Sequence, residues 1–380
     1  MNTRFLAFSA ACLLLLGCGH RLRDGEYTLT VLSTNDVHGA WFDSTYTGSR
    51  VRKSLFAAKY CIDSVRVADG AQNVLLVDAG DCLQGDNAVY YFNYVDTLSP
   101  HLFPRLMKYM GYDAIAWGNH DVETGHAVYD RVQRELVKDG IPFLAANAVR
   151  NDNGKSYFPQ YKLVDKAGLR IAVLGYENAN IRSWLSEELW SGMHFEPIAG
   201  RIQADVDYVR RKERPDVVVA IVHSGTGAGD GTNPESEAMD VFNLVNGVDW
   251  VICGHDHRPY VEARDSSALL NSGSHCRYLA HGKLRLRVEK GAVVERSYEA
   301  DLIPIKARLV DTAMRALFRP EFEAVREFTL REVGVLNVDL RTRDAYIGMN
   351  PYVNLIHTLC LGQEPAQLSF AAPLTPASTK

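Results

Sequence analysis

The 380-residue sequence predicts an α/β fold built from stacked layers of helices and strands. Three observations lead to this fold class. Short runs rich in β-branched residues alternate along the chain with longer runs of helical periodicity. Several of the short runs are apolar throughout, which is typical of strands buried on both faces. Glycine stands after several of the helical runs, where it favours the end of a helix.

The predicted elements follow one another in a regular order. The first strands are expected at residues 27–32, 74–77, 113–116, 171–174, 217–222 and 250–252. Helices are expected between them at residues 50–67, 101–110, 126–138, 200–212 and 235–244, and Gly111, Gly140 and Gly247 follow three of these. Three later runs are expected to be strands that close a second sheet, at residues 269–271, 283–288 and 293–298.

The composition is that of a folded, water-soluble domain. Hydrophobic residues make up 47% of the chain and charged residues 23%, which excludes a disordered, collagen-like or multi-span membrane chain. The formal net charge is −5, so no basic surface is expected to neutralise a nucleic-acid backbone. We therefore do not expect a partner among nucleic-acid duplexes.

The amino terminus has the features of an export signal. Arg4 precedes an almost wholly apolar run over residues 5–16, which is the length of a signal-peptide core and too short to span a bilayer. The run ends in Leu15-Leu16-Gly17-Cys18, which resembles a bacterial lipobox. Residues 1–17 are thus predicted to be a signal peptide of the lipoprotein type, with a lipid on Cys18 and a location in the periplasm or at the cell surface. Ordinary secretory cleavage, with Cys18 incidental, is the alternative.

Metal-type side chains stand at the predicted strand ends. In open α/β sheets, ligands bind beyond the carboxyl ends of the strands. Five such ends carry Asp, Asn or His beside glycine, in the segments Asn35-Asp36-Val37-His38-Gly39, Asp78-Ala79-Gly80-Asp81, Gly118-Asn119-His120-Asp121, His223-Ser224-Gly225 and Gly254-His255-Asp256-His257.

This donor set predicts a centre for two divalent metals. Carboxylates and imidazoles together suit Zn, Mn or Fe more than Ca or Mg, and seven side chains are too many for one tetrahedral ion. In Asp36-x-His38 and in His255-x-His257, both side chains of an extended pair would leave the backbone on the same side. Two adjacent metals can clamp a phosphoryl group and lower the pKa of a bridging water, which gives a hydroxide nucleophile near neutral pH.

The ordered segments DVHG, GDCLQG, GNHD, HSG and GHDH resemble the calcineurin-like metallophosphoesterases. Their order is most similar to the two-domain bacterial 5′-nucleotidase / 2′,3′-cyclic-nucleotide phosphodiesterase family, over about residues 27–300. The resemblance implies a four-layer αββα sandwich. It also implies a first metal held by Asp36, His38 and His257, and a second held by Asn119, His223 and His255. Asp81 would bridge both.

The resemblance also implies a catalytic pair. His120 would stabilise the transition state or protonate the leaving oxygen, because an imidazole has a pKa near working pH. In the family, an acidic residue three positions later orients this histidine and is most often Asp. Here the residue is Glu123, so the longer side chain changes the geometry of the pair.

Other residues near the motifs are expected to have structural functions. Asp78, Asp86, Asp113 and Asp256 are expected to form turns or to orient metal-bound imidazoles. His275 is expected to be a structural residue, with contact to the cavity from its loop as the alternative. Core packing is favoured over contact with a substrate base for Tyr90, Tyr91 and Tyr94. A wholly structural role for the Asp and His residues would need five coincidences at strand ends.

The predicted domain borders follow from these motifs. Residues 18–305 form the catalytic domain and residues 306–335 a helical linker. Residues 336–380 resemble the opening of the family's second domain, with one amphipathic helix and a strand ending at residues 371–374. One helix and one strand cannot enclose a core, so this α+β segment is expected to be incomplete, and a separate chain supplying the rest is one alternative.

The predicted function is metal-dependent hydrolysis of phosphoesters, nucleotides above all. Two alternatives remain open from the sequence. One is a related hydrolase that acts on nucleotide sugars, cyclic nucleotides or sulfur-linked groups. The other is a lipid-anchored metal-binding protein without turnover.

Overall fold

The computed structural model describes residues 22–370, apart from residues 49, 342–344, 346–349 and 364–365. The predicted signal peptide, Cys18 and the strand expected to end at residues 371–374 lie outside these residues. The chain divides into two units, one ending at Leu330 and one beginning at Arg331. All elements that carry the predicted site belong to the first unit.

Two six-stranded sheets form the centre of the first unit. In the first sheet four neighbouring strands run parallel to one another, and two further strands, each paired antiparallel with its neighbour, lie on one side of them. In the second sheet four parallel strands have one antiparallel strand at each edge. The first sheet has the order β14 (Ala292–Pro304), β13 (Tyr278–Glu289), β1 (Gly25–Thr34), β2 (Val74–Asp78), β3 (Ala114–Ala116) and β4 (Phe143–Leu144). The second has the order β11 (Pro259–Ala263), β12 (Ala268–Ser272), β10 (Trp250–Cys253), β9 (Val217–Val222), β7 (Leu169–Tyr176) and β6 (Tyr161–Lys166).

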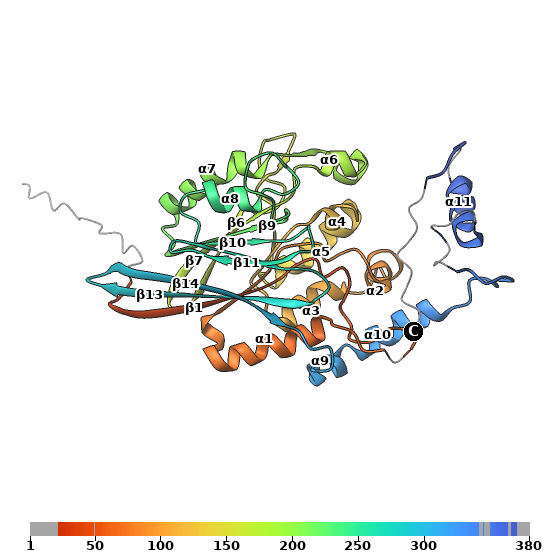
Figure 1. Ribbon diagram of the computed structural model, residues 1–380, viewed down its shortest axis with the longest axis horizontal. Coiled ribbons are helices and arrows are strands. Elements are labelled where there is room, and N and C mark those ends of the chain that lie inside the picture. Colours follow the sequence, from red (N-terminus) through yellow and green to blue (C-terminus); the bar gives the residue numbers. More distant parts are fainter. Residues whose placement is uncertain (1–21, 49, 342–344, 346–349, 364–365, 371–380) are drawn as a thin grey trace, which may run out of the picture. The chain divides into compact units, whose positions relative to one another are not determined.

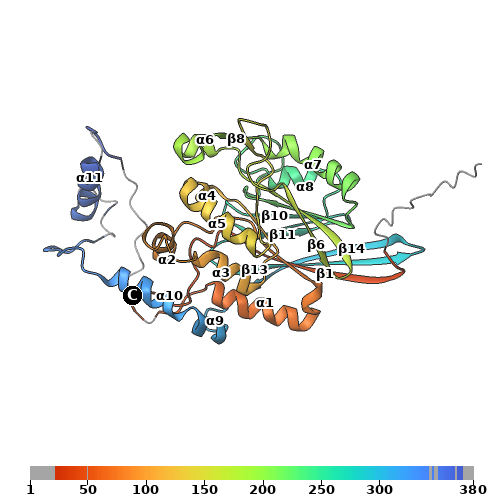
Figure 2. The same cartoon turned by 180° about the vertical axis from the view of Figure 1, so that it is seen from behind.

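Helices cover the outer face of each sheet (Figure 1). The first sheet is covered by α1 (Leu55–Asp69), α3 (Leu102–Met110) and α5 (His126–Lys138). The second sheet is covered by α7 (Ile198–Lys212) and α8 (Ala238–Leu244). The reverse view shows α7 and α8 on one side of the molecule and α1 on the other (Figure 2). The four-layer αββα sandwich that the resemblance implies is therefore confirmed.

Alternation along the strands fills three separate cores. In β1, Leu29 and Val31 face the second sheet, whereas Leu32 faces the helices of the first layer. In β9, Val219 and Ile221 lie between the sheets. The alternate residues Val218, Ala220 and Val222 face α7 and α8. Because both faces of these strands are buried, the sequence needs the continuous apolar runs by which the strands were predicted.

The expectation that residues 283–288 and 293–298 close the second sheet is wrong. They lie in β13 and β14, which belong to the first sheet, and β13 pairs antiparallel with β1 through Leu29 and Leu284. Only the strand at residues 268–272 joins the second sheet as expected. An alternating pattern identifies a half-buried strand but does not identify the strand with which it pairs.

Smaller elements complete the description. A two-stranded sheet contains β5 (Ala148–Arg150) and β8 (Met193–Phe195). Short helices are α2 (Asn87–Tyr90), α4 (Asn119–Val122), α6 (Ile181–Trp184), the 3-10 helices Ala71–Asn73 and Glu187–Trp190, and a π-helix, Tyr91–Val95. The first unit ends with α9 (Thr312–Leu317) and α10 (Arg319–Leu330), and the second unit contains α11 (Pro351–Gln363). None of the helices described between residues 22 and 370 is long and apolar enough to cross a membrane.

Candidate metal centre

The loops that follow the central strands carry the predicted ligands. The parallel strands of each sheet end at the same edge, so side chains distant in sequence come together there. The loop after β1 carries Asp36 and His38, the loop after β2 carries Asp81, and Asn119 opens α4 after β3. His223 follows β9, and His255 and His257 follow β10.

The first group of ligands contains Asp36, His38 and His257, with one ligand atom of each within 4.8 Å of the others. His257 Nε2 lies 3.5 Å from Asp36 Oδ1 and 2.9 Å from His38 Nε2. Asp36 is fully buried and His38 is 8% exposed. These are the three side chains expected at the first metal.

The second group contains Asp81, His223 and His255, again within 4.8 Å of one another. His223 Nε2 lies 3.2 Å from Asp81 Oδ2. Asn119 Oδ1 lies 2.9 Å from His223 Nε2 and 2.9 Å from His255 Nδ1, so the amide oxygen belongs to the same group. Asp81 Oδ2 is also 3.9 Å from His38 Nε2, which puts this carboxylate between the two groups.

The donor atoms fit divalent metal ions. His223 Nδ1 lies 2.7 Å from the carbonyl oxygen of Ala79, so Nδ1–H donates to this carbonyl and Nε2 faces Asp81, where it could bind a metal ion once deprotonated. His38 Nδ1 is buried and has no hydrogen-bond partner within the described chain. Carboxylate, amide and imidazole donors at this density are the ligands of Zn, Mn or Fe rather than of Ca.

The electrostatics of the second group also fit a cation. Burial alone would lower the pKa of His223, but the Asp81 carboxylate beside it raises that pKa well above its usual value. Burial alone would raise the pKa of Asp81, yet the neighbouring His223 lowers it. Without a metal, these two groups therefore hold a proton between them. A divalent ion would take its place, so metal binding should release a proton.

The backbone of the ligand loops differs from the predicted one. The expectation of extended Asp36-x-His38 and His255-x-His257 pairs is wrong, because these residues have φ values of 48°, 45°, 75° and 57°. Such left-handed conformations turn the chain sharply, and His255 and His257 therefore point into different groups.

His120 and Glu123 lie beside the two groups. His120 Nδ1 is 2.5 Å from Glu123 Oε2, and the His120 ring centroid is 5.3 Å from that of His38. The His120 backbone N–H donates to Asp81 Oδ1 over 2.8 Å. Burial alone would lower the pKa of His120, but its hydrogen bond to Glu123 raises it. The longer side chain of Glu123 thus reaches the imidazole directly.

Asp121 holds the loop that carries Asp81. Its carboxylate is fully buried and accepts backbone N–H groups from Asp81, Cys82, Leu83 and Gly118 at 2.7–3.0 Å. A Cβ at Gly118 would lie 2.4 Å from the Asp81 nitrogen, so only glycine allows the two loops to approach this closely. The sequence placed Asp121 in a motif but did not reveal this function.

Sequence reasoning missed several neighbours of the ligands. Asn35 Nδ2 donates to Asp36 Oδ2 over 2.7 Å, and Glu235 Oε1 lies 3.1 Å from His255 Nε2. The Trp184 ring stacks on His255 with centroids 5.2 Å apart. Asn35 stood inside a quoted motif and could have been found there. Glu235 and Trp184 lie in segments without any metal-type pattern.

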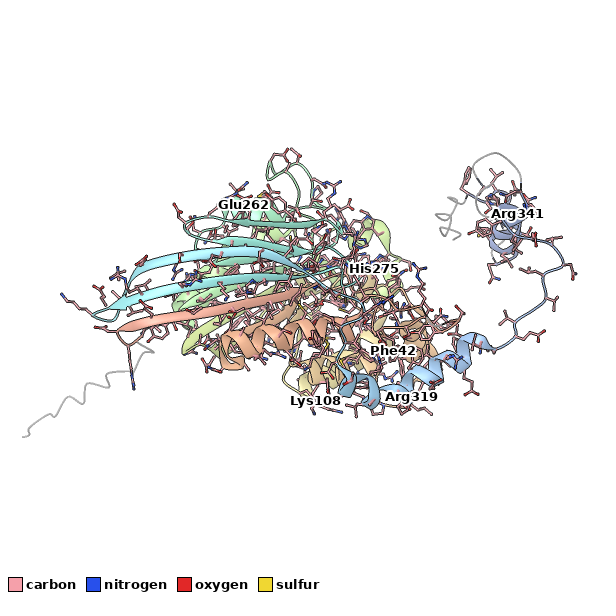
Figure 3. All side chains as sticks on the ribbon, turned by 60° about the horizontal axis from the view of Figure 1, so that its bottom comes forward. Phe42, Lys108, Glu262, His275, Arg319 and Arg341 are labelled. Carbon is pink, nitrogen blue, oxygen red and sulfur yellow. The ribbon has the colours of Figure 1, made fainter. Side chains whose placement is uncertain are left out.

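The less favoured candidates have mixed outcomes. His275 does reach the site, since its ring centroid is 5.3 Å from that of His38, and it lies at the end of the sheets opposite the β13–β14 turn (Figure 3). The expectation that Tyr90 and Tyr94 pack in the core is wrong, because these side chains are 55% and 49% exposed. Asp78 and Asp256 have the expected local functions, because they accept the backbone N–H groups of Gly80 and Thr226.

Comparison with known proteins agrees with this fold. Residues 29–259 match the family model described as calcineurin-like phosphoesterase. The chain belongs to this family, whose members use divalent metals.

Two curated proteins are similar to this chain in sequence. The chain is 30% identical over 243 residues to a 5′-nucleotidase of Vibrio cholerae, covering 62% of this chain and 41% of the relative. It is 27% identical over 249 residues to the protein UshA of Yersinia enterocolitica, covering 64% and 43%. The matched part thus spans about two-fifths of the length of these curated relatives.

Solved structures share the fold. A putative 5′-nucleotidase of Staphylococcus aureus has a TM-score of 0.75 at 20% identity, covering 89% of this chain and 66% of that one. The calcineurin-like phosphoesterase YfkN of Bacillus subtilis has a TM-score of 0.71 at 20% identity, covering 81% of this chain and all of that one.

Proposed function

We propose that the protein hydrolyses phosphoesters, nucleotides among them, with two divalent metal ions at the strand ends. The observation that carries the proposal is the convergence of seven side chains into two adjacent ligand groups. Membership of the phosphoesterase family and similarity to 5′-nucleotidases support the substrate class. Divalent ions at such a centre supply Lewis acidity toward a phosphoryl oxygen and an activated water.

Different residues of the chain would bind the metal ions and donate the proton. Asp36, His38 and His257 would hold one ion, Asn119, His223 and His255 the other, and Asp81 both. Zn, Mn and Fe fit the donor set best. His120 would donate a proton to the leaving oxygen from the imidazole nitrogen that does not face Glu123. Glu123 orients the ring and favours its protonated form, since the hydrogen bond raises the pKa of His120.

Turnover of p-nitrophenyl phosphate and of AMP with added Mn or Zn tests the proposal. The His120→Ala variant should lose ~10²–10⁴-fold in kcat with AMP, whose alkoxide leaving group needs a proton. The kcat of this variant with p-nitrophenyl phosphate should fall much less, because nitrophenolate is a stable leaving group that needs no proton. The Asp81→Asn variant should lose bound metal, measured by elemental analysis.

The exposed His194 offers a matched control outside the site. The His194→Ala variant should keep both activities and its metal content. Equal losses of His120→Ala with the two substrates would contradict the proton-donor role, and undiminished turnover in Asp81→Asn would refute the metal mechanism.

We further propose that the protein is exported and anchored through a lipid on Cys18. The support is the apolar run at residues 5–16 followed by Leu15-Leu16-Gly17-Cys18. Labelling of cells with radioactive palmitate should mark the wild-type protein and not the Cys18→Ser variant. Equal labelling of the two would rule out this anchor.

A further inference from the structure

A basic pocket lies beside the first ligand group. It has a volume of about 460 Å³, and His38 forms part of its wall. Three cationic side chains line it, together with His275 and one carboxylate. We use the name basic pocket for the cavity lined by His38, Arg52, Lys53, Asp86, His275 and Arg277.

The positive charges of this pocket are only partly neutralised. Arg52 Nη1 forms an ion pair with Asp86, so these two charges cancel. Lys53 Nζ instead donates to the carbonyl oxygen of Arg277 over 3.1 Å. Arg277 Nη2 donates to Ser274 Oγ over 3.0 Å and to the His257 carbonyl oxygen over 3.3 Å. Within the part of the chain that the structure describes, neither Lys53 nor Arg277 has a carboxylate at ion-pair distance.

The hydrogen bonds tie both cations to the ligand loops. The contact from Arg277 to the His257 carbonyl fixes the guanidinium next to a residue of the first group. The backbone N–H of His275 donates to the Asp36 carbonyl over 2.9 Å, which anchors the same loop from the other side. Cations that are already positioned lose little conformational entropy when an anion binds. Two adjacent cations without a counter-ion also repel each other, and a bound anion removes that repulsion.

We propose that the basic pocket binds a second anionic group, a phosphate or a carboxylate, of a substrate whose phosphoryl group lies at the metal centre. The common wall at His38 supports this, because one small molecule can lie in both sites. The inference rests on the proposed function and makes phosphoesters that carry a second anion the preferred substrates. Lys53 and Arg277 are the residues that recognise it, through charge-assisted hydrogen bonds.

Binding of non-hydrolysable probes tests the inference without relying on turnover. Isothermal titration calorimetry on the Mn-loaded full chain would compare methylphosphonate, which has one anionic group, with phosphonoacetate and methylenediphosphonate, which have two. The wild-type protein should bind at least one doubly anionic probe more tightly than methylphosphonate. In the Lys53→Ala/Arg277→Ala variant that preference should fall by at least ~10-fold, since two hydrogen bonds to charged groups are lost.

Controls separate this inference from the proposed function. The Lys138→Ala/Arg211→Ala variant removes two exposed cations from α5 and α7 and should keep the preference. The Arg277→Lys variant keeps the charge and should lose only part of the preference, which guards against misfolding of the double variant. A wild-type protein without preference, or an equal loss for all probes, overturns the inference. No methylphosphonate binding and no turnover would instead refute the metal centre itself.

The comparison of phosphonoacetate with methylenediphosphonate also identifies the second anion. Preference for phosphonoacetate alone indicates a carboxylate, and preference for methylenediphosphonate alone indicates a phosphate. Either result supports the basic pocket.

Discussion

Five of the candidate ligands have a backbone conformation that residues with side chains rarely adopt. Their φ values lie between 45° and 75° at Asp36, His38, Asp81, His255 and His257. Such conformations are unfavourable by about 1 kcal/mol or more each and persist only where the surroundings fix them. Hydrogen bonds between the ligand loops provide this support, for example from the Asp36 N–H to the Gly80 carbonyl at 2.9 Å. The strain therefore belongs to a site in which the loops hold one another.

Asp121 is the residue on which this mutual support depends most. Each of its carboxylate oxygens accepts two backbone N–H groups. In the Asp121→Asn variant an NH₂ group would face two of these donors, and we expect a loss of about 2–4 kcal/mol in the free energy of unfolding. Metal affinity should fall by ~10–100-fold because Asp81 loses its fixed position. Urea unfolding and metal titration measure the two effects.

The exposed loop residue Asp152 provides the comparison for this variant. Asp152→Asn makes the same chemical change away from the site and should leave both quantities unaltered. Metal affinity in Asp121→Asn equal to that in Asp152→Asn would show that the Asp81 loop does not need this carboxylate.

His101 makes the stability of the first unit depend on pH. It is fully buried at the start of α3, where its Nδ1 accepts the Phe103 N–H, and burial lowers its pKa from 6.5 to about 3. Between pH 3 and pH 6.5, His101 is therefore protonated in the unfolded chain and neutral in the folded chain. The stability contributed by neutral His101 is complete above pH 6.5 and is lost as the pH falls toward 3, about 5 kcal/mol in total.

Urea unfolding between pH 7 and pH 4 tests this effect. The His101→Asn variant keeps a favourable helix cap but has no titrating ring, so its stability should fall less on acidification than that of the wild type. Parallel pH profiles for the two proteins would show that His101 does not titrate in this way.

At the scale of elements, the sequence revealed strands with two buried faces better than strands at sheet edges. β9 is apolar throughout and was predicted with its observed bounds. β6 and β11 at the edges of the second sheet were missed, because most of their residues are half-buried or exposed and no apolar run marks them. The positions of the candidate ligands could be predicted because these residues follow apolar strands. Glu235 could not be predicted, because it lies in a loop whose path depends on tertiary contacts.

The contact between the sheets gives two glycines opposite effects on stability. A Cβ at Gly282 in β13 would lie 2.3 Å from the ring of the fully buried Trp250 in β10. The Gly282→Ala variant should therefore lose about 1–3 kcal/mol through overpacking. Gly200 in α7 has no atom within 4 Å of an added Cβ, so Gly200→Ala should gain up to about 1 kcal/mol through helix propensity.

Thermal unfolding of the two variants under the same conditions checks these signs. If Gly282→Ala were as stable as Gly200→Ala, the sheets would have room to move apart, and the close packing described between β10 and β13 would be disproved.

At the scale of the whole molecule, the first unit carries its own core and the complete candidate site. Its last two helices belong to that core, because Met314, Phe318 and Val325 are buried with residues such as Phe56 of α1. The sequence identified helical character after residue 306 but gave no sign that these helices pack on the sandwich. Such contacts involve partners far apart in the chain, which a local pattern does not encode.

Two truncations of the chain test this division. A protein ending at Leu330 should keep the melting temperature and metal binding of the full chain, because α11 in the second unit has no buried side chain. A protein ending at Pro304 would lose α9 and α10 and uncover Phe56 and its apolar neighbours. Fully burying an apolar side chain contributes about 1.5–3 kcal/mol, so removing Met314, Phe318 and Val325 together should lower the melting temperature by several degrees or prevent folding. Calorimetry on the three proteins distinguishes these outcomes, and a stable Pro304 truncation with an unstable Leu330 truncation would reverse the assignment of the core.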